Sequence, residues 1–459
     1  LLDLTQRTVE VNEDYIAGFL TFLPEPSQTP YKGIDAVPPA CAVIIRERKV
    51  ETKRFWGLDP TREIHHQTDA EYEEHFRHLF REAVLCRLRG DAPIFSELSG
   101  GLDSSSIVCM ANHLVSNKEV EAPCLRTVSM IFDEAFTSDE RRFIEAVERR
   151  AGQKSLSLRE DDFRLLSPLE SDYRPAIPNH MANFTAYYKA ICEEMRRNGA
   201  RVLLSGKGGD EILGSARDPF PELADLLMKG DLLRFHDRLR VWSRALEESY
   251  FRVLWRNVIV RLLPRKLQYS RRKGFDQVLQ LYDPAFVKRM KLRDRLWGPS
   301  DIFGFRQPSR RSRAASFLYV PRELSAGYWR ELCNLEFSYP FTHRPLVEFM
   351  HAIPYEQLVR PHQSKSLLRR ALRDLLPPEI FNRKGKGRNA DAFARAAQRE
   401  KSRLQSMLSE GRACAGGYLN LPAMRAAITN EVLCSPILLL GPFEHWLQSL
   451  QQRMADVRP

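Results

Sequence analysis

Residues 99–105 read Ser-Gly-Gly-Leu-Asp-Ser-Ser, and these residue types at this spacing can bind the phosphates of a nucleotide. The two glycines let backbone N–H groups approach an anion closely, and Ser104 and Ser105 add hydroxyl donors. Asp103 would be out of place in a simple anion site, but a carboxylate beside phosphates can hold Mg²⁺, which prefers oxygen ligands. The run therefore predicts a site for nucleotide phosphates together with magnesium.

The segments on either side of this run predict the elements that position it. Residues 92–98 end like a buried strand, and apolar residues recur at helical spacing over 106–115. A helix that begins at the run directs its unpaired N–H groups and the positive end of its dipole at a bound anion. The run is not a Walker A loop, which would read GxxxxGK[ST].

A second glycine turn follows a second predicted strand. Residues 201–204 read as a strand, and residues 205–211 continue as Ser-Gly-Lys-Gly-Gly-Asp-Glu. In open parallel sheets, ligands bind outside the carboxyl ends of the strands. The two turns can therefore face one nucleotide, and together they are much more specific than either turn alone.

Hydrophobic periodicity predicts most of the remaining elements. The other expected strands are 41–46, 52–56 and 127–132. The expected helices are 69–88, 139–150 and 184–197. Residues 215–330 are expected to be mostly helical, apart from a basic segment at 306–313. We interpret that segment as a solvated loop, with a mobile peptide-contacting loop as the alternative.

The composition is that of a globular protein with room for two or three domains. The chain has 459 residues, of which 43% are hydrophobic, and a formal net charge of +11. This charge suits a protein that handles ATP, pyrophosphate or an acidic peptide, although an arginine-rich solvated surface would give the same value. The eight cysteines include no CxxC pair, which argues against a zinc site or a disulfide framework and for a reducing compartment. No apolar run is long enough to span a membrane and no signal peptide is visible, so we expect a cytoplasmic location.

The two glycine turns resemble the motifs of a known enzyme family. Residues 99–105 resemble the pyrophosphate loop of the ATP pyrophosphatases, and residues 205–211 resemble the second motif of the asparagine synthetases, SGEGxDE. Segments that resemble the later motifs of the same family then follow in the family's order. They are 335–349, 365–372 and 383–387. The resemblance is to the ATP domain of the asparagine synthetases and extends from about residue 65 to residue 395.

This resemblance implies a fold class and a domain organisation. The implied fold is α/β, with a parallel sheet that has helices on both faces, the adenine-nucleotide α-hydrolase-like arrangement. Residues 1–62 resemble the C-terminal part of an α+β glutaminase-like (Ntn-type) domain, without its nucleophile. Residues 63–459 are expected to form an ATP-pyrophosphatase synthetase domain with a helical C-terminal part.

The resemblance also implies roles for individual residues, with ATP and Mg²⁺ as the cofactors. Asp103 and Asp210 are implied to hold Mg²⁺. Glu336 falls where lactam-forming relatives place a carboxylate that helps to deprotonate the amine. Lys384 or Lys386 falls near the family's catalytic lysine, which would stabilise the oxyanion and the leaving phosphate. The residues implied to bind ATP are Leu98, Ser99, Gly100, Gly101, Leu102, Asp103, Ser104, Ser105, Ser129, Met130, Ile131, Ser205 and Gly206.

Departures from the family pattern narrow the expected function. Lys207, which we count among the candidate catalytic residues, stands where an asparagine synthetase carries Glu and a β-lactam synthetase carries Tyr. A lysine ammonium can donate to a phosphate or a peptide carbonyl, but it cannot orient the ammonium of an amino acid. His343 replaces the usual Asp, and Ser338 replaces the usual Arg. Residues 339–349, and Ser-Glu-Leu at 96–98, resemble lasso-peptide cyclases, which join a peptide's N-terminal amine to an Asp or Glu side chain.

These resemblances imply an ATP-dependent carbon–nitrogen ligase. The expected activity is that of a lasso-peptide cyclase that adenylates an Asp or Glu side chain of a precursor peptide and closes a macrolactam, releasing AMP and pyrophosphate. An asparagine synthetase-like or β-lactam synthetase-like small-molecule ligase is the alternative, and a non-catalytic ATP-binding scaffold is a third interpretation. The expected partners are the precursor peptide, a leader-binding protein and a leader peptidase, with no nucleic acid and no membrane span.

Overall fold

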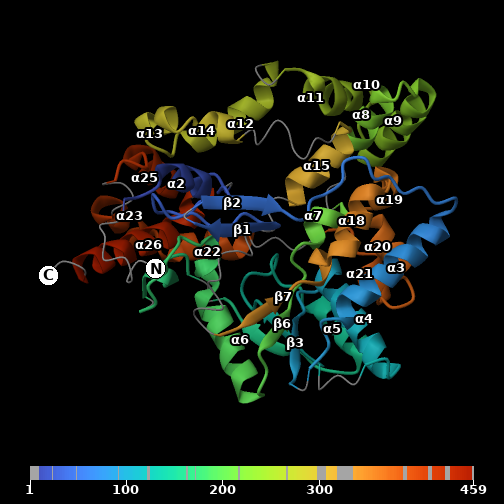
Figure 1. Ribbon diagram of the computed structural model, residues 1–459, viewed down its shortest axis with the longest axis horizontal. Coiled ribbons are helices and arrows are strands. Elements are labelled where there is room, and N and C mark those ends of the chain that lie inside the picture. The colour runs from blue at the N-terminus through green and yellow to red at the C-terminus, as the bar shows by residue number, and fades with distance from the viewer. Residues whose placement is uncertain are drawn as a thin grey trace.

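A five-stranded parallel sheet lies at the centre of the lower half of this computed structural model, as oriented in Figure 1. Its spatial order is β5-β4-β3-β6-β7, so the chain starts in the middle of the sheet and adds strands on both sides. The strands are β3 (Ile94–Glu97), β4 (Leu125–Ile131), β5 (Leu156–Arg159), β6 (Val202–Leu204) and β7 (Glu336–Ser338). The structure describes residues 10–456, except for 23, 48, 91, 121–124, 162–163, 171, 215–217, 265–266, 297–305, 318–333, 386–389, 412–415 and 430–434.

Helices cover both faces of this sheet, as the resemblance implied. Ile94 and Leu204 share one buried cluster with α3, α4 and α5, whereas Phe95 and Leu203 share another with α6. Neighbouring residues enter different cores because successive side chains of a strand point to opposite faces. These helices are α3 (Asp69–Leu85), α4 (Leu102–Ser116), α5 (Arg141–Ala151) and α6 (Thr185–Arg197).

Most of these elements were predicted from periodicity, and two strands were not. The helices expected at 69–88, 139–150 and 184–197 are confirmed as α3, α5 and α6. α3 begins where the pattern indicated because Thr68 and Glu71 form a capping box. β5 and β7 were not predicted, since each is very short and is extended through pairing with the strand beside it.

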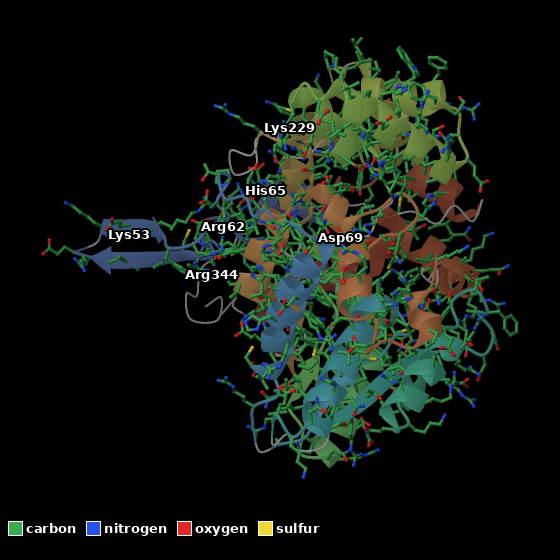
Figure 2. All side chains as sticks on the ribbon, turned by 90° about the vertical axis from the view of Figure 1, so that its right-hand side faces the viewer. Lys53, Arg62, His65, Asp69, Lys229 and Arg344 are labelled. Carbon is green, nitrogen blue, oxygen red and sulfur yellow. The ribbon has the colours of Figure 1, made fainter. Side chains whose placement is uncertain are left out.

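A two-stranded hairpin projects from the body of the protein, and Figure 2 shows it at Lys53. β1 (Cys41–Arg46) and β2 (Lys49–Arg54) pair antiparallel, with Ile45 opposite Val50. Ile45 is 71% exposed and Val50 is 68% exposed, so these side chains add nothing to a core. The second strand begins earlier than the expected 52–56, because the turn between the strands is tighter than the pattern indicated.

A second core joins the early and late parts of the described chain. Ile16 and Phe19 of the first helix are buried with the C-terminal helices, and Phe19 lies 6.0 Å from Phe443 between ring centroids. Residues on both sides of position 62 therefore share one core, and the division of the chain there stays a prediction. The elements of this core include α2 (Glu13–Leu20), α23 (Lys401–Glu410), α25 (Leu421–Thr429) and α26 (Ser435–Asp456).

The region between β6 and β7 is largely helical, as expected. Its helices include α7 (Gly209–Leu213), α8 (Phe220–Met228), α9 (Leu232–Leu246), α10 (Tyr250–Val253), α11 (Val260–Leu262), α12 (Tyr269–Leu279), α13 (Pro284–Arg289), α14 (Leu292–Leu296) and α15 (Pro308–Phe317). Those between β7 and α23 are α18 (Arg344–Ala352), α19 (Tyr355–Leu358), α20 (Ser366–Ala371), α21 (Pro378–Phe381) and α22 (Ala390–Arg399). Within the described ranges, no helix combines the length and the apolar character needed to cross a membrane.

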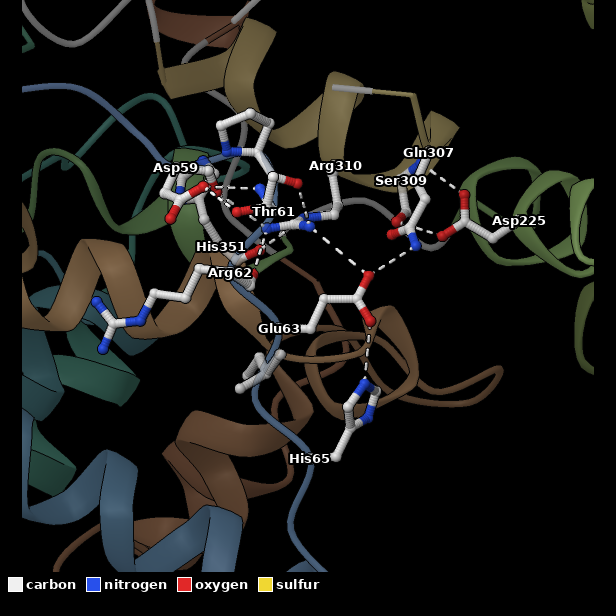
Figure 3. Close-up of polar contacts among 12 residues, drawn as sticks. Asp59, Thr61, Arg62, Glu63, His65, Asp225, Gln307, Ser309, Arg310 and His351 are labelled. Carbon is white, nitrogen blue, oxygen red and sulfur yellow. Dashed lines mark hydrogen bonds and ion pairs between the residues drawn. The ribbon is translucent and has the colours of Figure 1, made fainter. Parts of the chain in front are cut away.

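The basic segment at 306–313 is not a solvated loop, so that prediction is wrong. Residues 308–313 form the start of α15, and Arg310 and Arg313 are buried. Arg313 Nη1 donates to the backbone carbonyl of Met350 over 2.5 Å. Arg310 Nη1 donates to the backbone carbonyl of Pro60 over 2.8 Å, and Figure 3 shows Arg310 beside the segment that contains Asp59, Thr61 and Arg62. The last carbonyls of a helix lack partners within it, and a planar guanidinium can satisfy several carbonyls at once. These charges therefore fasten the end of α18 and the segment that precedes α3.

Candidate active site

A cavity of about 590 Å³ lies at the carboxyl ends of β3, β4 and β6, where both glycine turns are found. This volume is within the usual range of small-molecule sites, about 300–1,000 Å³. α4 begins at the first turn, so its unpaired N–H groups lie at the cavity. The predicted residues that line the cavity are Leu98, Ser99, Gly101, Leu102, Asp103, Ser104, Met130, Ser205, Gly206, Lys207, Asp210 and Lys384.

The first turn is held in shape by its own hydroxyl groups. Ser104 Oγ lies 3.0 Å from Ser99 Oγ and accepts a hydrogen bond from the Ser99 backbone N–H over 3.1 Å. Gly100 has a φ of +70°, and a Cβ there would lie 2.9 Å from Phe143 Cβ, so the turn requires glycine. Gly100 and Ser105 do not line the cavity, and the buried Ser105 hydroxyl has no hydrogen-bond partner among the described residues.

Asp103 and Asp210, one from each turn, converge on the amine of Lys365. Lys365 Nζ donates to Asp103 Oδ1 and Oδ2 over 2.7 and 2.5 Å, and to Asp210 Oδ1 over 2.6 Å. Burial disfavours the charged amine, but the two carboxylates outweigh burial and raise the pKa of Lys365 above its usual value. The structure thus joins the two motifs through a lysine to which the sequence pattern assigned no role.

The same two carboxylates fit the expected magnesium site. A single cation draws them to one point, and carboxylate oxygens are ligands that Mg²⁺ prefers. Gly209 allows this approach, because a Cβ there would lie only 2.7 Å from Asp103 Cγ. In the part of the chain that the structure describes, no group of three or more Asp, Glu, His or Cys side chains is arranged to hold a metal ion. A magnesium ion held by this pair would therefore need further ligands from a nucleotide and from water.

Two buried arginines fix the backbone that carries Lys384. Arg383 Nη1 donates to the backbone carbonyl of Gly100 over 2.6 Å, which ties this segment to the first glycine turn. Arg369 Nη2 donates to the carbonyl of Arg383 over 2.8 Å. Lys384 follows directly and lines the cavity. The second candidate, Lys386, lies outside the described residues.

β4 presents alternate residues to the cavity. Val128 and Met130 line it, whereas Ile131 packs into the core on the other face of the sheet. Ser129 is fully buried, and its hydroxyl donates to the backbone carbonyl of Leu98 over 2.7 Å. Of the three residues expected beside the adenine, Met130 alone therefore borders the cavity, and Ser129 instead ties β4 to the end of β3.

A further part of the cavity wall is aromatic and comes from α6. Tyr187 and Tyr188 are buried and lie edge to face, with 5.1 Å between ring centroids. The Tyr188 hydroxyl donates to Glu97 Oε1 over 2.9 Å, and Lys207 of the second turn lines the same cavity. Burial raises the pKa of the Glu97 carboxyl above its usual value, although hydrogen bonds and the charge of Lys207 act in the opposite direction.

The structure does not bring Glu336 to the cavity. Glu336 lies beside Val202 at the amino end of β6, whereas the second glycine turn leaves β6 from Leu204 at the other end. Glu336 is also exposed and is not among the residues that line the cavity. Its role as a base stays a prediction that this geometry does not support, because the order of motifs does not determine the register of a strand.

A second cavity, of about 420 Å³, lies between α22, α23, α25 and α26. Its lining is mainly aliphatic, with Arg395 and Lys401 as the basic groups. None of the predicted site residues lines it. Because the carboxylates and glycine turns gather at the first cavity, that cavity is the candidate active site.

The functional residues that the sequence pattern missed are mainly basic side chains that hold the motif residues in place. Lys365 and Arg369 are basic residues within a helical apolar pattern, and Arg383 adjoins a glycine-containing turn. Their segments, 365–372 and 383–387, were identified by resemblance to family motifs, but these three residues were given no role, because a basic residue in such a pattern resembles a surface charge. Glu97 did leave a signal, since an acidic residue at the end of an otherwise buried strand needs a partner or a purpose.

Comparisons with known proteins identify chains that are similar to this one. The asparagine synthase family model matches residues 75–448. The chain is 27% identical over 379 residues to the glutamine-hydrolyzing asparagine synthetase 3 of Bacillus subtilis, which covers 78% of this chain and 55% of that protein. It is 24% identical over 420 residues to asparagine synthetase 1 of the same bacterium, covering 84% of this chain and 60% of that protein. It is 29% identical over 216 residues to the amidase chyE of Penicillium rubens, covering 45% of this chain and 32% of that protein. The chain thus spans little more than half the length of the two synthetases.

Proposed function

The chain belongs to the asparagine synthase family, and from this premise we propose that it is an ATP-dependent, AMP-forming carbon–nitrogen ligase. The observation that carries the proposal is the meeting of both glycine turns, with Asp103 and Asp210, at one cavity. A carboxylate would attack the α-phosphorus of ATP, and pyrophosphate would leave. An amine would then attack the acyl-adenylate, and AMP would leave.

The residues of the chain would act mainly by binding and orienting the reactants. The backbone N–H groups and hydroxyls of residues 99–105 would hold the pyrophosphate end of ATP. Asp103 and Asp210 would hold Mg²⁺, which when bound offsets the negative charge of the phosphates. Lys365 would keep the two carboxylates together before the nucleotide enters. Lys384 would donate to the carbonyl oxyanion and to the leaving phosphate oxygen.

More specifically, we propose a lasso-peptide cyclase, which joins the N-terminal amine of a precursor peptide to one of its Asp or Glu side chains. Two features support this choice. Lys207 lines the cavity with a positive charge, which suits a peptide carbonyl better than the ammonium of a free amino acid. The tyrosines of α6 give an apolar wall that suits a peptide segment and would help to exclude water from the adenylate. The precursor peptide, a leader-binding protein and a leader peptidase are the proposed partners.

A small-molecule amide ligase is the second candidate, and the similar proteins favour it. Both Bacillus subtilis relatives are named as asparagine synthetases, whose name implies a free amino acid as the product. An asparagine synthetase-like or β-lactam synthetase-like activity would use the same ATP site. The two candidates therefore differ in the carboxylate that the cavity accepts and not in the first chemical step.

ATP–pyrophosphate exchange tests both candidates in one assay. The panel contains L-aspartate, L-glutamate, a small β-amino acid, and linear peptides that carry one Asp or Glu. Exchange with peptides alone supports the cyclase, and exchange with a free amino acid alone supports the small-molecule ligase. Peptides with an acetylated N-terminus are the control, because they should still exchange but should give no ring. Formation of ADP in place of AMP, or no exchange with any carboxylate, would contradict the ligase.

A further inference from the structure

Glu97 places a further carboxylate at the cavity, apart from Asp103 and Asp210, which share Lys365. It is the last residue of β3, and only Leu98 separates it from Ser99 of the first glycine turn. It lines the same cavity as Ser99 and Lys207. A negative charge so close to a phosphate site opposes anion binding, so its presence needs a separate explanation.

Side chains of α6 enclose this carboxylate. Tyr188 donates to Glu97 Oε1 over 2.9 Å, and both Tyr187 and Tyr188 are 5% exposed. The Tyr188 ring also packs edge to face against Phe337, with 5.4 Å between ring centroids. Glu97 itself is only partly buried, and the space that it borders is the cavity. One oxygen of the carboxylate is thus hydrogen-bonded to Tyr188, and Glu97 borders the cavity in which a ligand would lie.

The groups around Glu97 set its affinity for a proton. They are Tyr187 and Tyr188 of α6, together with Ser205 and Lys207 of the second glycine turn. Burial has the largest effect and raises the pKa of Glu97. Hydrogen bonds from Ser205 and Tyr188, and the charge of Lys207, offset part of that rise. A carboxylate with a raised pKa attracts a cation and is a stronger base than an exposed glutamate.

We propose that Glu97 binds the amine nucleophile and takes a proton from it. This inference rests on the proposed ligase function and supplies the acceptor group for its second step. The matching substrate is a primary amine, an ammonium ion at neutral pH, on an apolar or aromatic chain such as the first residue of a peptide. Tyr187 and Tyr188 line the cavity, and their rings suit both parts of such a group, since aromatic rings attract ammonium ions and pack against apolar chains.

The step balances without a further reactant. The ammonium passes one proton to a carboxylate oxygen of Glu97, and the lone pair set free forms the C–N bond with the acyl carbon. The bond from that carbon to the AMP oxygen breaks, and its electron pair stays with the phosphate. The second excess proton of the nitrogen goes to the departing phosphate. Glu97 then returns its proton to solvent after AMP has left.

The test compares Glu97→Gln with the unchanged protein, using the most active peptide of the exchange panel. Gln keeps the size of the side chain and removes the base. We expect ATP–pyrophosphate exchange within about twofold of the unchanged protein, and amide formation slower by about 10²-fold, the lower end of general-base contributions. Hydroxylamine, which is neutral at pH 7, needs no base, so hydroxamate formation should stay within about twofold in Glu97→Gln.

The pH profile of amide formation gives a second readout that a structural role would not move. The rate should fall on the acidic side as Glu97 becomes protonated. Glu97→Gln can use only amine that is already neutral, so its rate should instead fall below the pKa of the amine, about 7.7–8.0 for an α-amino group. Tyr188→Phe removes a hydrogen bond that lowers the pKa of Glu97, so the acidic limb should move to higher pH in that variant. Glu148→Gln is the matched control, because Glu148 is a buried glutamate that does not line the cavity.

The outcomes separate this inference from the function on which it rests. Amide formation at the normal rate by Glu97→Gln would overturn the inference alone. Equal loss of exchange, amide and hydroxamate in a folded Glu97→Gln would also overturn it, since Glu97 would then support the whole site. No exchange with any carboxylate in the unchanged protein would overturn the proposed function, and the inference with it.

Discussion

The phosphate end and the aromatic end of the cavity are built in different ways. Residues 99–105 and 205–211 make the phosphate end, and each is a continuous segment in which a strand passes through a glycine turn into a helix. The aromatic end is assembled from separate elements, with Glu97 on β3 and Tyr187 and Tyr188 on α6. Backbone groups and glycines dominate the first, and side chains dominate the second.

This difference implies that the phosphate end carries out the ATP chemistry and that the aromatic end selects the carboxylate or amine. A backbone turn that requires glycine accepts few changes, so the ATP chemistry is expected to be the constant part. Side chains on a helix and at strand ends can change without disturbing those turns, so the acceptor end can be adapted to another carboxylate or amine. Substitutions at the two ends should therefore alter different steps of the reaction.

The largest effect is expected from Asp103→Asn at the phosphate end. The change removes a charge that holds Lys365 and, in the proposed function, Mg²⁺. We expect ATP–pyrophosphate exchange to fall by about 10³-fold with every carboxylate, comparable to the loss of a strong electrostatic group in an active site. Asp294→Asn, at an exposed position on α14, is the control. Exchange at the normal rate in Asp103→Asn would remove the metal role and the basis of the comparison.

The two ends also differed in how far the sequence predicted them. The phosphate end was predicted almost completely, because its function needs a local pattern of glycines, hydroxyls and a carboxylate next to a strand and a helix. The role of Lys365, which joins Asp103 to Asp210, was not predicted. Its segment, 365–372, was identified by resemblance, but the role of Lys365 depends on partners that only the fold brings to it.

In the fold, too, the sequence predicted the elements with a local pattern and missed those that depend on distant partners. Long amphipathic helices such as α3 and α6 were predicted because burial on one face imposes a helical period. β5 and β7 were missed because sheet pairing, rather than their own residues, makes them strands. Arg310 and Arg313 were assigned to solvent because a run of charges usually lies there, but α18 and the segment before α3 supply backbone carbonyls that bind them. Which face of β4 meets the cavity likewise depends on register and not on composition.

A smaller effect is expected from Lys384→Ala, at a residue that lines the cavity outside both of these ends. Loss of a donor to the oxyanion should slow amide formation by about 10²–10³-fold, while ATP still binds. The measurement is the rate of AMP release at saturating ATP, with Lys386→Ala made in parallel because both lysines are candidates. Lys118→Ala, on the exposed turn after α4, is the matched control. Normal rates in both Lys384→Ala and Lys386→Ala would show that neither lysine stabilises the oxyanion.

Gly209→Ala tests how closely the two turns must approach. The new Cβ would lie 2.7 Å from Asp103 Cγ, so the carboxylate must move. A displacement of about 1 Å in an active site can cost about 10²-fold, and we expect exchange to fall by up to that factor. Gly274→Ala on α12 is the control, because no atom lies within 4 Å of the Cβ position there. Equal activity of both variants would mean that the turns tolerate separation.

Lys207→Ala tests a residue that belongs to the second glycine turn and also acts on Glu97 of the aromatic end. We expect the KM for the carboxylate substrate to rise by about tenfold, the effect of one hydrogen bond to a charged group, with the KM for ATP unchanged. Steady-state kinetics with each substrate varied in turn separate the two constants. A rise in the KM for ATP alone would assign Lys207 to the phosphates, and the acceptor end would then consist of Glu97 and the α6 tyrosines.

The smallest effect is expected on β4, where Met130 and Ser129 are neighbours with opposite surroundings. Met130 lines the cavity, so Met130→Ala should raise the KM for ATP by about fivefold, because roughly 1 kcal/mol of apolar contact with the base would be lost. Ser129 hydrogen bonds to the Leu98 carbonyl, so Ser129→Ala should lower the free energy of unfolding by about 1–2 kcal/mol and leave that KM unchanged. Kinetics and thermal unfolding of the two variants form one experiment in which each serves as the control for the other. A raised KM for ATP in Ser129→Ala, with an unchanged KM in Met130→Ala, would place the adenine base on the side of the sheet that α3 and α4 cover. The cavity between the glycine turns could then no longer be the ATP site.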